Sequence, residues 1–146
     1  MDSFFGSMNI SASGLAAQRL RMNILSSNLA NAQTTRTPEG GPYKRQDVIF
    51  TAKPDKDNFE EFLGDTFNTT TRNVQVTGIF KDNKEPKKIF DPQNPDADKE
   101  GYVRMPNIQM VTEMVNMITA TRAYEANTTA FNEAKNMALK TLELGK

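Results

Sequence analysis

The strongest apolar pattern of the chain lies in residues 105–146. One row of apolar or small side chains has a spacing of seven and consists of Met110, Met117, Tyr124, Phe131 and Ala138. A second row, four positions further on, consists of Met114, Thr121, Thr128 and Leu142. Residues three and four apart share one face of a helix, so we expect both rows on the same side of one long helix. At 1.5 Å per residue this helix would be about 60 Å long, more than a core of this chain could cover.

A second helical pattern covers residues 3–33 and ends before Pro38, which disfavours helix in the residue that precedes it. Its main row also has a spacing of seven and consists of Met8, Leu15, Met22 and Leu29. This row alone fits an ordinary amphipathic helix as well as a coiled-coil seam. Two such helices at opposite ends of one chain predict an antiparallel coiled coil, in which each helix covers the apolar stripe of the other.

The beginning of the C-terminal helix is apolar on almost every side. Its apolar residues are Ile108, Met110, Val111, Met114, Val115, Met117 and Ile118. So wide an apolar surface is normally buried on several sides, which one partner helix cannot achieve. We therefore expect other subunits to cover it. The candidate assembly residues are Met8, Leu15, Met22, Leu29, Met110, Met114, Met117, Ile118, Tyr124 and Phe131.

The middle of the chain has the composition of a small β-rich region. Residues 45–50 and 73–80 are predicted strands, and 87–90 and 102–103 are shorter candidates. Residues 52–71 are polar and charged, and they either contain a helical turn at 59–63 or are disordered. The predicted fold is α+β, with a helical domain of residues 1–37 and 105–146 and a small β-rich domain of residues 38–104.

The composition argues against catalysis and against nucleic acid as a partner. The 18 Lys and Arg residues balance 18 Asp and Glu, so no net field attracts a polyanion. The chain has no Cys and no His, which removes thiolate chemistry, the usual proton-transfer group and the commonest metal ligand. We expect no catalytic residue, no cofactor and no small-molecule substrate. The sequence shows neither a transmembrane run nor a cleavable signal peptide, so the chain is cytoplasmic unless an export route needs neither.

One loop resembles the first half of an EF-hand calcium site. Asp96, Asp98 and Glu100 occupy its positions 1, 3 and 5, and Gly101 occupies position 6. Position 12 is Asn107 instead of the bidentate glutamate that calcium requires. A solvated turn leading into a strand is the better interpretation. A binding module with a weak calcium loop at 96–107 remains the alternative function.

Several longer motifs follow one another along both ends of the chain. The N-terminal part contains ISASGL at 10–15, SNLANA at 27–32 and TTRTPEGGPYKRQ at 34–46. The C-terminal part contains DADKEGYV at 96–103, VNMI at 115–118 and RAYEAN at 122–127. In this order the motifs resemble the bacterial flagellar axial proteins of rod, hook and filament, and residues 34–46 resemble the proximal-rod members most. The centre of the chain matches least.

The resemblance implies a structural role. Members of the family are exported unprocessed by the flagellar type III apparatus, which would reconcile a missing signal peptide with a place outside the cytoplasm. They assemble helically into the rod, the drive shaft that crosses the periplasm, with their terminal helices inside. The expected partners are other rod subunits, further copies of the chain, the MS ring and the export adaptor at the rod base. A rod subunit is thus expected in preference to a binding module or a carboxylate enzyme.

Overall fold

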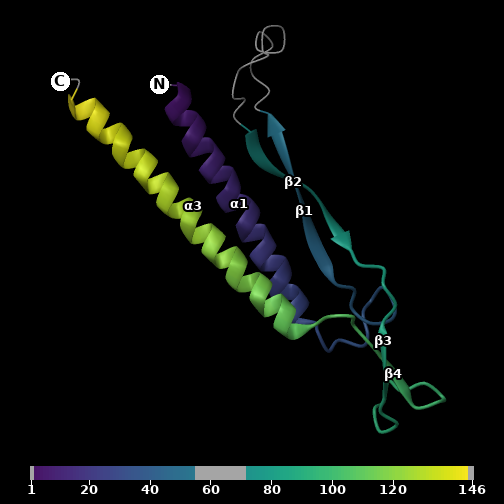
Figure 1. The fold of residues 1–146 in the computed structure, drawn as a ribbon. Helices are drawn as coiled ribbons and strands as arrows, with labels where there is room; N and C mark the ends of the chain where they lie inside the picture. Colours follow the sequence, from purple (N-terminus) through teal and green to yellow (C-terminus); the bar gives the residue numbers. More distant parts are fainter. Residues whose placement is uncertain (1, 55–71, 145–146) are drawn as a thin grey trace.

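The computed structural model describes residues 2–54 and 72–144 (Figure 1). Its elements are α1 (Asp2–Ala30), β1 (Gln46–Pro54), β2 (Arg72–Lys81), β3 (Lys87–Phe90), β4 (Tyr102–Met105) and α3 (Met110–Leu144). The two helices pack along their length and run antiparallel, so the two ends of the chain lie at the same end of the pair (Figure 1). The α+β class and the antiparallel pairing of the terminal helices are confirmed.

Both helices differ from their predicted bounds at the end that faces the middle of the chain. α1 ends at Ala30, and residues 31–33 form a turn in which the Asn31 side chain donates to the Ser27 carbonyl at 2.9 Å. α3 begins at Met110 and not near Met105, because residues 102–105 pair with β3 instead. Pro106, which follows β4 directly, has no amide hydrogen and disfavours helix in the residue before it.

The sheets are two antiparallel hairpins, and all four predicted strands are confirmed. β1 pairs with β2 from Gln46↔Lys81 to Pro54↔Arg72, with an irregularity between Ile49 and Phe50. β3 pairs with β4, where the rings of Phe90 and Tyr102 meet edge to face at a centroid distance of 5.3 Å. The helical turn considered at 59–63 lies outside the described residues.

The helices and the first hairpin form three layers, with α1 in the middle. α1 contacts α3 on one side and both β1 and β2 on the other. A hydrogen bond joins the first hairpin to α1, because the Val74 amide of β2 donates to the Ser13 hydroxyl of α1 at 3.1 Å. The β3–β4 hairpin lies beyond the lower end of the helices (Figure 1).

The apolar core of the described residues is thin. Its buried members are Ala17, Ile24, Leu25, Val103, Ile108, Ala120 and Ala134. Three of these are alanines, so burial within one chain removes little large apolar surface from water. Much of the large apolar surface of the molecule therefore remains uncovered.

Within the described residues, no helix combines the length and the apolar character that crossing a bilayer requires.

Candidate assembly interface

Small residues bring the two helices close together. Ala17 on α1 and Ala120 on α3 are 3 % and 0 % exposed, and Gly14 is buried as well. A methyl group at Gly14 would lie only 3.0 Å from the Nδ2 atom of Asn127, so glycine allows this approach. The helix contact therefore depends on side chains that are short, in contrast to the large apolar rows predicted for it.

The predicted N-terminal row lies partly in this contact. Its four members, Met8, Leu15, Met22 and Leu29, are all half-buried. On α3, Met117, Tyr124 and Phe131 are half-buried too. A weak hydrogen bond from the Thr121 hydroxyl to the Met22 sulfur, at 3.6 Å, joins the two helices near the middle.

The prediction that both rows of α3 lie on the side that α1 covers is wrong for Met110, Met114 and Leu142. These three residues are exposed, with exposed fractions of 46 %, 49 % and 60 %. Their place is taken by a row of small and polar residues, which are Glu113, Ala120, Asn127 and Ala134. This row also has a spacing of seven, but sequence reasoning missed it because none of its members is large and apolar. Polar contacts hold the first member of the row, Glu113, in its buried position.

Asn28 is the centre of a buried polar cluster at the lower end of the helix pair. Its exposed fraction is 0 %, and all its hydrogen-bonding capacity is used. The Asn28 amide nitrogen donates to the Gln46 carbonyl at 2.7 Å and to the Glu113 carboxylate at 3.0 Å. Its oxygen accepts from the Gln46 amide at 3.0 Å and from the Tyr43 hydroxyl at 3.2 Å. One side chain thus joins α1, β1 and α3.

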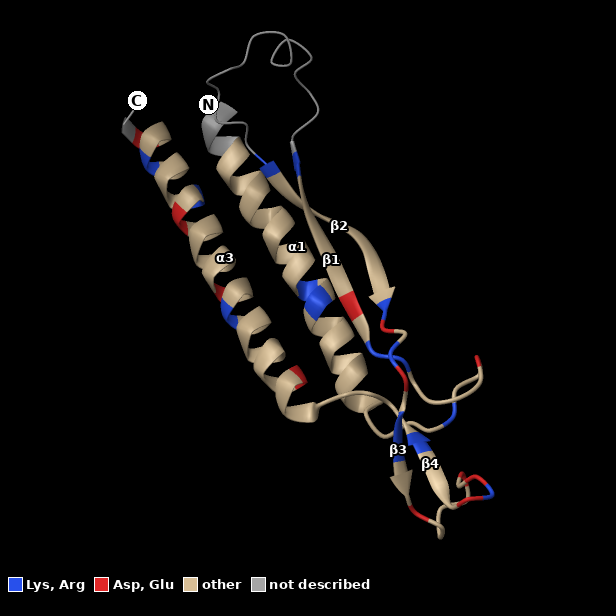
Figure 2. Ribbon diagram, turned by 45° about the vertical axis from the view of Figure 1, so that its right-hand side comes forward, with Lys and Arg blue, Asp and Glu red and all other residues tan. Residues whose placement is uncertain are grey.

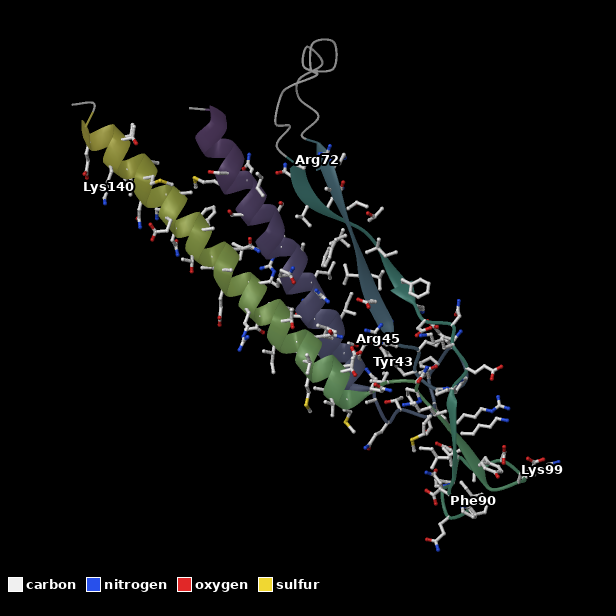
Figure 3. All side chains as sticks on the ribbon, in the orientation of Figure 1. Tyr43, Arg45, Arg72, Phe90, Lys99 and Lys140 are labelled. Atoms are coloured by element: carbon white, nitrogen blue, oxygen red, sulfur yellow. The ribbon has the colours of Figure 1, made fainter. Side chains whose placement is uncertain are left out.

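The charge of Glu113 is compensated by Arg45. Glu113 is 2 % exposed, and its second carboxylate oxygen accepts from the Arg45 Nε at 2.8 Å. Arg45 also pairs with Asp47 at 3.0 Å. Burial lowers the pKa of Arg45, but the hydrogen bonds to Glu113 and Asp47 outweigh it and leave this pKa above its ordinary value. Figure 3 shows Tyr43 and Arg45 where β1 begins beside the ends of both helices. We call Asn28, Tyr43, Arg45 and Glu113 the polar cluster.

Large apolar side chains gather on the side of α3 that α1 does not cover. Five residues form this group, which we call the apolar face, and their exposed fractions are 46 % for Met110, 75 % for Val111, 49 % for Met114, 56 % for Val115 and 55 % for Ile118. The first turns of α3 carry one acidic position and otherwise no charge (Figure 2). Contiguous apolar surface of this kind marks an interaction site in a soluble protein.

The carboxylates of the calcium-like loop have partners within the chain. Asp96 accepts from Arg36 at 2.6 Å and from the Thr35 hydroxyl at 2.5 Å. Asp98 accepts from the amides of Glu100 and Tyr102. The described residues contain no group of three or more His, Cys, Asp or Glu that could hold a metal ion. These contacts favour a self-capped turn that ties the β3–β4 hairpin to residues 35–36.

Comparison with known proteins places this arrangement in a class. The family described as flagella basal body rod protein matches residues 8–36, and the family described as flagellar basal body rod FlgEFG protein C-terminal matches residues 99–144. These two segments contain most of α1 and all of α3. The paired terminal helices are therefore those of a flagellar rod protein.

Relatives over nearly the full length narrow the class to one family. The chain is 45 % identical to the flagellar basal-body rod protein FlgC of Borreliella burgdorferi, with 91 % of each chain covered. It is 42 % identical to FlgC of Bacillus subtilis, with 97 % of this chain and 98 % of the relative covered. With FlgC of Aquifex aeolicus the identity is 41 % over the whole of both chains. The chain belongs to the FlgC family of flagellar basal-body rod proteins.

Proposed function

We propose that the apolar face of α3 is the surface through which this rod subunit contacts its neighbours. As a member of a structural family, the chain is a subunit of the flagellar basal-body rod, not an enzyme, and it assembles with other rod subunits. The single observation that carries the proposal is the exposure of five large apolar side chains on one side of α3. Burial of each of them would contribute on the order of 1 kcal/mol to assembly.

A contact of this kind suits a helical assembly. The proposed contact joins the apolar face of one subunit to a different surface of its neighbour. Contacts between two different surfaces generate open helical arrays when the rotation does not close. In such an array, the helical domain of residues 1–37 and 105–146 forms the inner part, and the β-rich domain of residues 38–104 lies outside. The helix-seam residues Met8, Leu15, Met22, Leu29, Met117, Tyr124 and Phe131 support the face from within the subunit.

Membership of the FlgC family also suggests where the chain acts and which proteins surround it. The chain acts in the proximal rod, after export by the flagellar type III apparatus, and transmits torque across the periplasm. Its neighbours there include the MS ring and the export adaptor at the rod base. The thin core of the isolated subunit supports this view, because a chain that leaves large apolar side chains uncovered is stabilised by its neighbours.

The experiment introduces one charge on the apolar face. We expect Met114→Asp to abolish swimming when it replaces the native gene, because an unpaired carboxylate cannot be buried between subunits without a large cost. Thr112→Asp is the matched control, since Thr112 is exposed on the same turn of α3 but is not part of the face. It should swim normally. Normal swimming of Met114→Asp, with the protein detected in basal bodies, would refute the proposal.

A further inference from the structure

Two neighbouring residues of α3 show the reverse of the burial that the hydrophobic effect favours, because the charged one is buried and the apolar one is exposed. Glu113 is 2 % exposed, whereas Met114 is 49 % exposed. Successive residues of a helix are about 100° apart around its axis. Rotation of α3 by that amount would bring Met114 to the seam and Glu113 to water, which is the arrangement that apolar burial favours for this pair of residues.

The polar cluster opposes this rotation. Each carboxylate oxygen of Glu113 has its own donor, one from Asn28 at 3.0 Å and one from Arg45 at 2.8 Å. Rotation would break both contacts and leave the amide of Asn28, which is fully buried, without one of its partners. A buried polar group without a partner is strongly destabilising, and single buried polar contacts are known to fix the register of helix pairs.

The cluster also connects the helices to the first hairpin. Asn28 exchanges two hydrogen bonds with the backbone of Gln46, the first residue of β1. Arg45 is held in turn by Asp47 at 3.0 Å. Asn28 and Arg45, which donate to the Glu113 carboxylate, therefore have fixed positions. They can bind this carboxylate in only one rotation of α3 about its axis.

We infer that Asn28, Arg45 and Glu113 are positioning residues for assembly, which fix the rotation of α3 about its axis and so keep the apolar face on the outside of the subunit. The inference deepens the proposed function, and it rests on that function for the role of the face. It assigns to the cluster a role that differs from added stability. The cluster keeps Met114 out of the subunit's own seam, where it would otherwise be buried before a neighbour arrives.

The test measures the rotation of α3 by disulfide formation in the purified full-length chain, which has no native cysteine. One reporter carries Gly14→Cys and Asn127→Cys, because a Cβ atom at position 14 would lie beside the Asn127 side chain. The matched reporter carries Gly14→Cys, Asn127→Ala and Thr128→Cys, so that the rotated position is sampled without crowding. With the native cluster, the 14–127 pair should oxidise faster than the 14–128 pair. Equal rates would overturn the inference.

The decisive variant removes both donors and leaves α3 unchanged. In Asn28→Leu/Arg45→Met, Glu113 has no partner in the seam, and we expect the preference for the 14–127 pair to fall. A variant that keeps both its helical circular dichroism and the full preference for 14–127 would overturn the inference. If the double variant loses its helical signal, the test is made with Arg45→Met alone. This variant should reduce the preference for the 14–127 disulfide, and an unchanged ratio of the two oxidation rates would contradict the inference.

A conservative variant separates positioning from general stability. Arg45→Lys keeps a cation near Glu113, so the preference for 14–127 should persist even if the chain becomes less stable. Loss of that preference in Arg45→Lys, at full helical content, would contradict the inference. The proposed function fails separately, through normal swimming of Met114→Asp, because the disulfide ratios are measured without any rod partner.

Discussion

The two sides of α3 differ in a way that an ordinary amphipathic helix does not show. The side that contacts α1 presents alanines, an asparagine and a buried glutamate beside the half-buried Met117, Tyr124 and Phe131, whereas the outer side of its first turns presents exposed methionine, valine and isoleucine. A helix that served only its own domain would bury the second set. The difference indicates two kinds of contact, a close one within the subunit and an apolar one between subunits.

The polar cluster is where the contact within the subunit is most specific, so its loss should have the largest effect. Asn28→Ala leaves Glu113, Tyr43 and the Gln46 backbone without their shared partner, and we expect the free energy of unfolding to fall by on the order of 3 kcal/mol. Urea denaturation followed by circular dichroism measures this. The control is Asn23→Ala, at an exposed position of the same helix, with a change within about 0.5 kcal/mol. Equal effects of the two variants would contradict the role of the cluster.

The close approach of the helices gives the next largest effect. Ala120 is 0 % exposed, so Ala120→Leu must push the helices apart, and we expect a loss of about 1–3 kcal/mol in the same urea experiment. Ala130→Leu is the matched control, because Ala130 is an exposed alanine of the same helix. It should change the free energy of unfolding by less than about 0.5 kcal/mol. If Ala120→Leu were as harmless as its control, the seam would not be closely packed.

The smallest effect concerns Asp98, far from both sides of α3. The hydrogen bond from the Tyr102 amide lowers the pKa of this carboxyl, helped by the Glu100 amide and the charges of Lys88 and Arg104, and it outweighs slight burial. Because the folded pKa is depressed, the contribution of Asp98 is present above its unfolded value of about 3.9 and is lost as the pH falls through the folded value. The amide NMR signals of Glu100 and Tyr102 should therefore stay constant down to about pH 4 and shift below it. Asp98→Asn should remove this shift, and a transition above pH 5 would contradict the assignment.

The helices and strands were predictable from the sequence where the spacing of apolar residues along the chain determines them. The spacing of seven predicted both helices, and alternation in residues such as Val74 and Val76 predicted β2. The start of α3 was placed too early, because Arg104 and Met105 extend the predicted strand at 102–103 and pair with β3. Pro106 is a local signal of this boundary, since it disfavours helix in the residue before it.

The existence of an apolar surface on α3 was predictable from the sequence, but the residues that α3 buries against α1 were predictable only in part. The excess of apolar residues at 108–118 correctly indicated more surface than one helix could cover. The burial of Glu113 was not predicted, because counting apolar positions ignores a glutamate, and Met110 of the predicted row is exposed instead. Only the three-dimensional meeting of Asn28, Arg45 and Glu113 makes a glutamate the buried residue. No spacing along the chain connects these three positions.

The most direct test of the account is the accessibility of Val111 before and after assembly. Val111 is the most exposed member of the apolar face, at 75 %, and the chain has no native cysteine, so Val111→Cys provides a single reactive thiol. We predict rapid reaction with a maleimide in the purified subunit and strong protection in isolated basal bodies that contain the same variant. A thiol that reacts equally fast in both would contradict the claim that neighbouring subunits cover this face.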